Sequence, residues 1–433
     1  MTRIIDTTRR RLIGTSLAAG ALASWSRLSF AGNASRAVDA GANRLVFVIL
    51  RGGMDGLYAA PAIGDPAFAD ARGSLGLYPT PPLALDNTFA LHPILAQLHA
   101  MYGRGELAVV HAVGLPYRDR SHFDAQQVLE SGGTRPYELT TGWLGRALAG
   151  GNTKGLALST AVPLVLRGRA AVDTWAPSYL PDPTADLVAR IERMYGNDAA
   201  LATALGRAKA LHFDPVTMAD AAAASSADGT SMSSGAMNGG PAKGASMNKP
   251  INKPNAGAAA GGAFVQLAQR AAEFLAQPDG PQAAVLEVNG WDTHANQAAP
   301  NGPLATYFRQ LDAGLVALRD GIVTSGTWAR TAIVVASEFG REVAINGTLG
   351  TDHGTGGVAF VLGGAVQGGR VLTDWPGLAK KDRYEGRDLR TTTDLRGVLK
   401  GLLADQLQVT GRTLDAVVFP GSEGVKGLRL IRS

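Results

Sequence analysis

Residues 44–50 read RLVFVIL, a continuous apolar run. The stretch after it, residues 51–56, reads RGGMDG and places one carboxylate, Asp55, among three glycines. An unbroken apolar run is typical of a strand that helices cover on both faces, as in a parallel sheet. Because ligands of such sheets bind beyond the carboxyl ends of the strands, Asp55 is either a ligand-binding residue or an acceptor for the amides of the turn.

Four further apolar runs of the same kind predict more strands. The stretch at residues 304–322 repeats large apolar residues at steps of three and four, which predicts an amphipathic helix. Strands that alternate with helices are typical of an α/β fold, so we predict a three-layer α/β/α sandwich with a mostly parallel central sheet. The four runs are residues 107–113, 284–288, 331–336 and 358–362.

The amino terminus has the pattern of an export signal. Residues 8–13 read TRRRLI, the twin-arginine pattern of a Tat signal, and a mildly apolar segment follows. Small residues before and at Ala31 suit a cleavage site, so we predict a signal peptide over residues 1–31. The alternative is a membrane anchor, but glycines, serines and Arg27 make the segment short and polar for a bilayer span. The expected location is the periplasm or the exterior, reached through the Tat export machinery, without a stable membrane span.

The charge of the chain changes once this signal is set aside. The full chain carries 41 basic and 36 acidic residues, a formal net charge of +5. Residues 1–31 hold five arginines and one aspartate, so 36 basic and 35 acidic residues remain, or +1. A nearly neutral protein gives no indication of a nucleic-acid partner. The sequence has no cysteine, so any metal ion is held by nitrogen and oxygen.

Residues 221–262 interrupt the pattern, because they are mostly Ala, Gly, Ser, Asn, Met and Pro. Such a composition buries too little apolar surface to offset the entropy of ordering, so we predict a disordered insertion. The insertion interrupts a domain over residues 40–405, and residues 406–433 are expected to form an extension that packs on this domain.

Three short polar motifs late in the chain carry most of the candidate site. They read WDTH at 291–294, SEFGR at 337–341 and TDHG at 351–354, and each lies near the end of an apolar run or just before one. Their imidazoles and carboxylates suit zinc, manganese, magnesium or calcium. Asp292 and His294 are two residues apart, so on a loop both side chains can reach one ion. The adjacent Asp352 and His353 form another candidate ligand pair.

Glu338 and Arg341 allow two interpretations. They can form a plain surface ion pair, worth roughly 0–1 kcal/mol. Alternatively, Glu338 is a metal ligand or a base, and Arg341 binds an anionic oxygen. Trp291 likewise either stacks on a substrate or belongs to the core.

Ser121 and His122 precede a helix-like stretch, residues 125–130. Ser121 is either the N-cap of that helix or a nucleophile aided by the helix N-terminus and a metal ion. His122 is a ligand, a general acid or a substrate contact. Four histidines outside the motifs are expected to be structural: His92, His99, His111 and His212.

Five motifs in one order resemble a family of exported bacterial proteins catalogued as domain of unknown function 1501. The resemblance spans roughly residues 40–405. That family is grouped with the alkaline phosphatase and sulfatase superfamily, whose fold is an α/β/α sandwich. Superfamily members place two divalent metals at the strand ends and attack phosphate or sulfate esters with Ser, Thr or a modified Cys. The motifs are GGMDG at 52–56, RSHF at 120–123, GWDTH at 290–294, SEFGR at 337–341 and TDHG at 351–354.

The resemblance implies roles for single residues. Asp55 matches the metal aspartate after the first strand, and Ser121 is the best match to the nucleophile. Asp292 and His294 resemble the Asp and His ligands of one metal, although the superfamily usually spaces them more widely.

The Asp-His-Gly signature of the superfamily directly follows its strand, whereas here SEFG occupies that place. Either a long loop intervenes before Asp352 and His353, or Glu338 replaces the aspartate and His353 serves as a later lone histidine. In the second case Phe339 stands where a histidine ligand is expected. The chain is therefore expected to bind one or two ions.

The resemblance implies an exported, metal-dependent hydrolase-like protein that acts on phosphate or sulfate esters of small molecules or polymers. The alternative is a non-catalytic exported binding protein that retains the fold with a degenerate metal site. In the hydrolase, the expected metal ligands are Asp55, Asp292, His294, Glu338, Asp352 and His353, and the expected catalytic residues are Ser121, His122 and Arg341.

Overall fold

The structure, a computed structural model, describes residues 41–151, 153–177, 183–212, 256–298 and 302–432. The predicted signal peptide and most of the predicted insertion lie outside these residues. The chain divides into two compact units, one of Met1–Phe30 with Ser178–Ala259 and one of Ala31–Pro177 with Ala260–Ser433. The candidate site belongs to the second unit.

The second unit is built on a large sheet of nine strands among the described residues. Eight of them follow the order β10-β4-β9-β8-β1-β7-β5-β6, and the ninth, β11, also pairs with β4. All five predicted strands are confirmed and belong to this sheet. The strands are β1 (Arg44–Arg51), β4 (Leu107–Gly114), β5 (Lys154–Ala157), β6 (Ala171–Thr174), β7 (Ala283–Asn289), β8 (Thr331–Ser337), β9 (Gly357–Leu362), β10 (Arg370–Leu372) and β11 (Thr393–Asp394).

The sheet is mostly parallel, and β9 is the exception within it. β9 runs antiparallel to both of its neighbours, β4 and β8. Its first residue, Gly357, pairs with Val113 near the carboxyl end of β4. The segment that precedes β9 therefore lies at the same edge of the sheet as the segments that follow β1, β4, β7 and β8.

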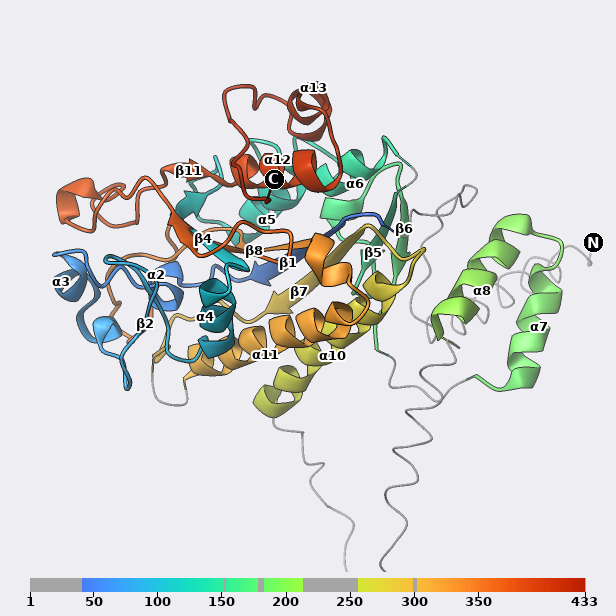
Figure 1. Cartoon of the computed structure of the whole chain (residues 1–433), viewed down its shortest axis with the longest axis horizontal. Helices are drawn as coiled ribbons and strands as arrows, with labels where there is room; N and C mark the ends of the chain where they lie inside the picture. Colours follow the sequence, from blue (N-terminus) through green and yellow to red (C-terminus); the bar gives the residue numbers. More distant parts are fainter. Residues whose placement is uncertain (1–40, 152, 178–182, 213–255, 299–301, 433) are drawn as a thin grey trace, which may run out of the picture. The chain divides into compact units, whose positions relative to one another are not determined.

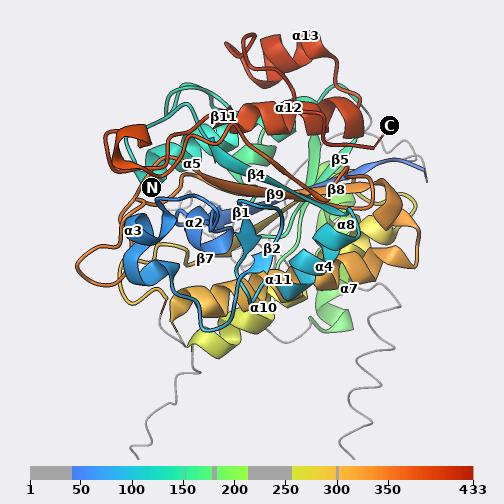
Figure 2. The same ribbon diagram turned by 60° about the vertical axis from the view of Figure 1, so that its left-hand side comes forward.

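Helices cover both faces of this sheet, which confirms the predicted three-layer α/β/α arrangement (Figures 1 and 2). The predicted helix at residues 304–322 is confirmed as α11. One face carries α5 (His122–Ser131), α6 (Trp143–Leu148) and α12 (Leu395–Gln406), and the other carries α4 (Ala96–Gly103), α10 (Ala256–Ala276) and α11 (Pro303–Val323).

Short elements complete the second unit, and the first unit contains a helical hairpin. In the hairpin, α7 (Ala185–Tyr195) packs on α8 (Ala199–His212) through a small core that includes Ile191 and Leu205. Among the described residues, no helix combines the length and the apolar character needed to cross a membrane. The short elements are α2 (Gly56–Ala59), α3 (Phe68–Arg72), β2 (Leu83–Ala84), β3 (Ala90–Leu91), α13 (Gly411–Thr413), a π-helical turn at Leu414–Val418, and 3-10 turns at Gly73–Gly76, Leu164–Leu166, Thr327–Arg330 and Lys380–Asp382.

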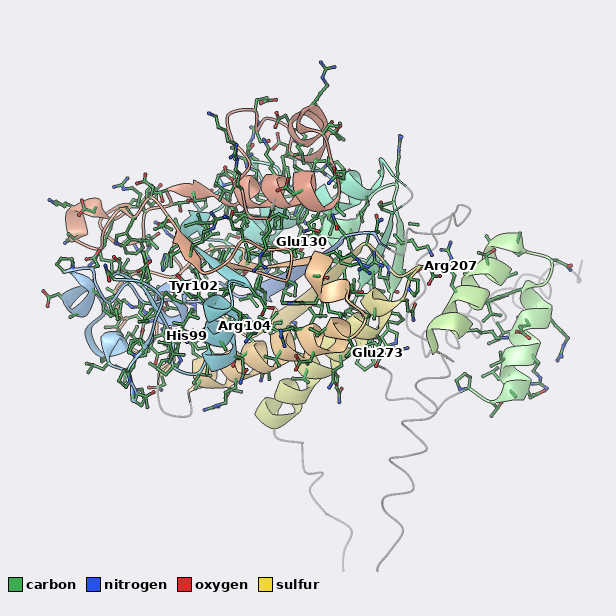
Figure 3. All side chains as sticks on the ribbon, viewed as in Figure 1. His99, Tyr102, Arg104, Glu130, Arg207 and Glu273 are labelled. Carbon is green, nitrogen blue, oxygen red and sulfur yellow. The ribbon has the colours of Figure 1, made fainter. Side chains whose placement is uncertain are left out.

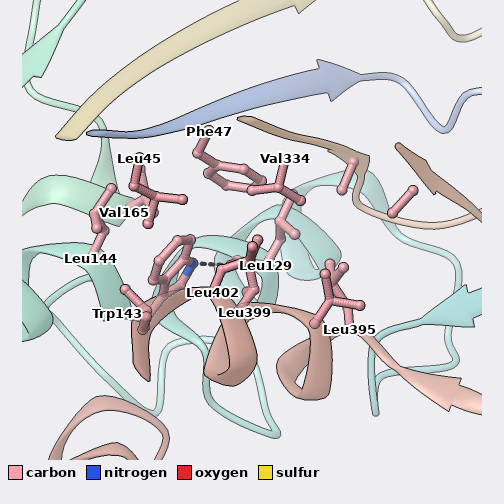
Figure 4. Close-up of a cluster of buried hydrophobic side chains, with 14 of the residues drawn as sticks. Leu45, Phe47, Leu129, Trp143, Leu144, Val165, Val334, Leu395, Leu399 and Leu402 are labelled. Atoms are coloured by element: carbon pink, nitrogen blue, oxygen red, sulfur yellow. Dashed lines mark hydrogen bonds between the residues drawn. The ribbon is translucent and has the colours of Figure 1, made fainter. Parts of the chain in front are cut away.

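A large apolar core lies between the sheet and the face with α5, α6 and α12 (Figure 4). Alternate residues of β1 point into it, as the two-residue period of a strand requires. Phe47 meets Trp143 with ring centroids 5.4 Å apart, and the Trp143 indole N–H donates to the Leu129 carbonyl over 3.1 Å. Phe419, from the segment predicted to be an extension, lies 5.9 Å from Trp143. Residues beyond 405 therefore form part of the core itself.

α10 begins inside the predicted insertion, at Ala256. Its first turns are rich in alanine, the best helix former, and they lead into Phe264 and Ala268, which are buried. Burial of this later part of the helix allows the Ala- and Gly-rich start to continue the same helix. The rest of the predicted insertion, residues 221–255, lies outside the described residues.

Candidate metal centre

The segment after β8 and the segment before β9 lie side by side. Arg341 and His353 pair in an antiparallel bridge, and the Gly354 amide donates to the Gly340 carbonyl over 2.9 Å. A Cβ on Gly340 would lie 1.9 Å from the Gly356 carbonyl oxygen, so only glycine permits this approach. The motifs SEFGR and TDHG are therefore one paired structure, although nine residues of chain, 342–350, separate them.

The loop after β7 joins this structure from the other side. The Trp291 amide donates to the Arg51 carbonyl over 3.2 Å, and the Thr351 amide donates to the Thr293 carbonyl over 3.3 Å. Gly52, with φ +121°, allows the end of β1 to lie against this loop, because a Cβ there would be 2.5 Å from the Asp292 nitrogen. All three late motifs thus meet at one edge of the sheet.

Three imidazoles surround one carboxylate oxygen at this edge. The Nε2 atoms of His122, His294 and His353 lie 3.4, 2.9 and 3.1 Å from Asp292 Oδ1. His353 Nε2 is also 3.0 Å from Nε2 of both His122 and His294. We call these four residues the histidine cluster. His122, Asp292 and His353 by themselves form a group whose ligand atoms are close enough to hold one metal ion.

The spacing within the histidine cluster fits a bound divalent ion. A single N–H on His353 Nε2 cannot serve two imidazole nitrogens and a carboxylate oxygen together. A tetrahedral ion with ligands at about 2.0–2.1 Å places those ligands about 3.3 Å apart. The observed separations of 2.9–3.4 Å are close to this value. The nitrogen and oxygen donors are also the types that zinc and similar divalent metals take in proteins.

The second nitrogen of each imidazole faces a hydrogen-bond acceptor. This arrangement assigns the ring proton to Nδ1 and leaves the lone pair of Nε2 directed into the cluster. Such outer acceptors are a regular feature of histidine metal sites. The acceptors are Glu338 Oε1 at 2.8 Å from His122, Asp352 Oδ1 at 3.1 Å from His294, and the Arg120 carbonyl oxygen at 3.0 Å from His353.

Arg341 lies beneath the cluster with its side chain fully buried. Its Nη2 donates to Asp292 Oδ1 over 2.6 Å. Burial opposes ionisation of Asp292, but this guanidinium outweighs it and lowers the pKa of Asp292 to about 2. All three nitrogens of Arg341 donate within the protein, which differs from the predicted contact with an anionic oxygen of a substrate. The remaining acceptors are the carbonyls of Gly52, Gly53, Trp291 and Thr351.

Glu338 is buried behind His122. Burial opposes its ionisation, but hydrogen bonds from His122 and Gln126 and from the Gly52 amide lower the pKa of its carboxyl. In return, the hydrogen bond to Glu338 raises the pKa of His122. Glu338 and Asp352 therefore orient imidazoles of the cluster from behind, whereas the sequence predicted both as metal ligands.

Asp55 lies among other buried groups and not in the cluster. Its Oδ2 accepts from Arg72 over 2.6 Å and from Gln297 over 2.7 Å, and its Oδ1 caps α2 by accepting from the Tyr58 amide. Gln297 in turn accepts from the hydroxyl of Thr351 over 2.9 Å. Asp55 is therefore not among the converging donors, unlike the predicted metal ligand, and its contacts match its other interpretation as a turn residue. Through Gln297 it is linked to Thr351 of the TDHG segment.

Ser121 is the N-cap residue of α5, but its side chain makes no capping hydrogen bond among the described residues. Its neighbour His122 is in the cluster, so α5 contributes the one cluster residue that comes from outside the three late motifs.

Phe339 packs against the cluster, with its ring centroid 4.7 Å from His122 and 5.0 Å from His353. Trp291 is fully buried against Phe308 and belongs to the core.

Three of the four histidines outside the motifs contact backbone, and the side chain of the fourth, His212, lies outside the described part of the chain. His92 Nδ1 accepts from the Ile94 amide over 3.1 Å, and His111 Nε2 lies 2.9 Å from the Ala60 carbonyl oxygen. His99, on α4, lies 2.9 Å from the Ala84 carbonyl oxygen (Figure 3). These contacts agree with their predicted structural role.

The sequence did not identify two groups that support the cluster. Gln126 lies one helical turn after His122 on α5, and this spacing could have suggested a shared contact with Glu338. The Arg120 carbonyl is a backbone atom, so no side-chain pattern indicates it.

The profile of the family described as Protein of unknown function (DUF1501) matches residues 101–418. This chain belongs to that family. No curated protein matches the chain.

Several solved structures are distantly similar to this DUF1501 protein. The PsFucS1 sulfatase from Pseudoalteromonas sp. is 13% identical, with 97% of this chain and 74% of that chain covered and a TM-score of 0.38. Ps i-CgsB in complex with k-i-k-neocarrahexaose is 10% identical, with coverage of 89% and 74% and a TM-score of 0.38. Murine ectonucleotide pyrophosphatase/phosphodiesterase 5 is 10% identical, with coverage of 69% and 57% and a TM-score of 0.30.

Proposed function

We propose that this protein is an exported, metal-dependent hydrolase of phosphate or sulfate esters, and that the histidine cluster holds its metal ion. The observation that carries the proposal is the convergence of three imidazole nitrogens on Asp292 Oδ1, with each ring held from behind by an acceptor. The ordered motifs resemble those of the DUF1501 family, and the grouping of that family with the alkaline phosphatase and sulfatase superfamily supports the choice of ester substrates.

Residues in and around the histidine cluster hold the ligand atoms in place and leave the site open to a substrate. When bound, a divalent ion supplies a Lewis acid that lowers the pKa of an attacking hydroxyl group and stabilises the charge that grows on the transferred group. Arg341 keeps Asp292 ionised as a ligand. The side chains of Asp292 and His294 are 45% and 41% exposed, so an ester can approach the cluster from solvent.

Ser121 is the proposed nucleophile, with a water molecule as the alternative. It directly precedes His122 and begins α5, whose N-terminus favours developing negative charge. Its hydroxyl does not cap the helix but interacts with the side chain of Tyr117. Replacement by alanine is expected to abolish turnover while metal binding persists, if the serine and not water is the attacking group.

Phe339 supports one ion per chain instead of two. Its ring packs against His122 and His353, so an apolar side chain occupies space beside the cluster where a second ion would need polar ligands. Elemental analysis of the purified protein therefore tests the proposal first, with an expected stoichiometry of one divalent ion per chain. A protein that carries and binds no divalent metal would exclude the proposed hydrolase.

A panel of phosphomonoesters, phosphodiesters and sulfate esters then tests the reaction. We expect metal-dependent hydrolysis of at least one class, lost in His353→Ala and retained in the control His99→Ala, whose imidazole contacts the Ala84 carbonyl away from the cluster. Metal binding without turnover of any ester would favour the second candidate, a non-catalytic binding protein. That candidate is favoured by Arg341, whose donors are all used within the protein.

A further inference from the structure

Arg120 has an unusual backbone conformation next to the cluster. Its φ of +59° lies in the left-handed region, which residues with a Cβ rarely adopt. In this conformation its carbonyl oxygen lies 3.0 Å from His353 Nδ1. The same residue directly precedes Ser121 and His122. A conformation of this kind persists only where surrounding contacts hold it.

Those contacts come from a segment outside all of the motifs. Arg120 Nε donates to Asp388 Oδ2 over 2.8 Å, and its Nη2 donates to Glu385 Oε2 over 2.5 Å. The side chain of Asp388 is fully buried, whereas that of Glu385 is 53% exposed. An ion pair screened by solvent contributes little, so the buried Asp388 is the stronger anchor for Arg120.

Asp388 holds a second arginine that also reaches His353. Arg387 Nε lies 3.2 Å from Asp388 Oδ1, an ion pair, and Arg387 Nη2 donates to the His353 backbone carbonyl over 2.9 Å. The same Nη2 also donates to Glu342 Oε2 over 2.6 Å, so Arg387 has a second carboxylate partner. The carbonyl oxygen of Arg120 therefore accepts from the ring of His353, and the guanidinium group of Arg387 holds the main chain of His353. Both guanidinium groups meet at the two oxygens of one buried carboxylate.

We infer that Asp388 is a positioning residue that fixes the ring and the backbone of His353 through Arg120 and Arg387. The inference rests on the proposed metal centre, since the orientation of His353 matters only if Nε2 binds an ion. Without the charge of Asp388, the two guanidinium groups lose their common partner. Arg120 then loses the contact that holds its left-handed backbone, and the acceptor for His353 Nδ1 moves with it.

Asp388→Asn in the full chain tests this inference, with Co²⁺ as the probe. Co²⁺ binding is followed by its visible absorption, which reports the ligand geometry. Loss of outer partners of a metal ligand typically costs 10–100-fold in affinity, so we expect a rise in the Co²⁺ Kd of about tenfold or more and an altered spectrum. The matched control is Asp312→Asn, because Asp312 is a buried carboxylate that accepts from the Gln97 and Leu98 amides on α4. The control is expected to lose stability but to keep the wild-type Kd and spectrum.

Arg120→Gly is the second variant, which keeps the left-handed backbone accessible and removes the guanidinium. We expect it to weaken Co²⁺ binding by up to about tenfold, and it tests the inference if Asp388→Asn does not fold. Wild-type affinity and spectrum in the folded variants would overturn the role of Asp388 and leave the proposed function intact. Absence of Co²⁺ binding by the wild-type protein would overturn both.

Discussion

Replacement of His353 by alanine should weaken metal binding about 100-fold and leave the stability of the metal-free fold almost unchanged. His353 Nε2 is 3.0–3.1 Å from two imidazole nitrogens and from Asp292 Oδ1, so it contributes one of four converging donors. Its side chain is only 25% exposed, yet its ring is crowded by other polar atoms when no ion is present. Truncation relieves this crowding, so the cost to the metal-free protein should stay below about 1 kcal/mol.

The effect on metal binding follows from the number of donors. Binding of zinc to a four-ligand protein site is worth about 10–16 kcal/mol, or about 3 kcal/mol for each ligand if the donors contribute equally. Loss of one donor should therefore raise the Kd by about two orders of magnitude. At an ion concentration about 1,000 times the wild-type Kd, binding stabilises the wild-type protein by about 4 kcal/mol and the variant by about 1.4 kcal/mol.

Thermal unfolding with and without Zn²⁺ measures this difference. For a unit of this size, 1 kcal/mol shifts Tm by about 1.5 °C, so the Tm increase caused by Zn²⁺ should be about 4 °C smaller in the variant. His99→Ala is the control, because His99 lies on α4 and contacts the Ala84 carbonyl. A His353→Ala protein with wild-type metal content and the full Tm increase would refute the assignment of His353 as a ligand.

Three further predictions test other parts of the structure. Arg341→Met removes the group that lowers the pKa of Asp292 to about 2. When Zn²⁺ binding is titrated with acid, the variant should therefore lose the metal at a higher pH than the wild type. Loss of Zn²⁺ at the same pH in both proteins would contradict this role of Arg341. Burial lowers the pKa of both His92 and His111 to about 4, against about 6.5 when unfolded, so the stability from their neutral forms is full above pH 6.5 and is lost as pH falls toward 4. Urea unfolding at pH 7.5 and pH 4.5 should show a loss of up to about 3 kcal/mol for each histidine, and equal stability at both values would speak against it. Phe47→Ala should lower the free energy of unfolding by about 3–5 kcal/mol in the same assay, because Phe47 is fully buried against Trp143. A loss below about 1 kcal/mol would mean that the core collapses around the space left by the ring.

The five longest strands and α11 could be predicted from the sequence. Burial on both faces leaves an unbroken apolar run in a strand, and burial of one face leaves apolar residues at steps of three and four in a helix. The direction of β9 could not be predicted, since an apolar run reads the same in a parallel or an antiparallel strand. Its antiparallel course explains why TDHG, which precedes a strand, meets motifs that follow strands. Sequence order alone would have put TDHG at the opposite edge of a fully parallel sheet.

The types of residue in the site were predictable, but their division into ligands and supporting groups was not. Glu338 and Asp352 stand in the motifs like ligands, yet each bonds to the outer nitrogen of a histidine. The sequence predicted that Arg341 lies near a carboxylate, and in the structure that carboxylate is Asp292. The structure also shows that the other hydrogen bonds of Arg341 end on backbone carbonyls, which the sequence could not indicate. The groups that orient His353 are a main-chain oxygen and residues of a distant segment, and neither forms a motif.

The place of Phe419 in the core has a consequence for the order of events during synthesis. Trp143 is made long before the ring of Phe419 that packs on it. The face of the sheet beneath α6 and α12 therefore stays open to solvent until the segment around Phe419 has been made. If the chain follows the Tat route, which carries folded proteins, its export must wait until Phe419 has been made and has packed. A nascent chain that stops before this residue should be retained and degraded.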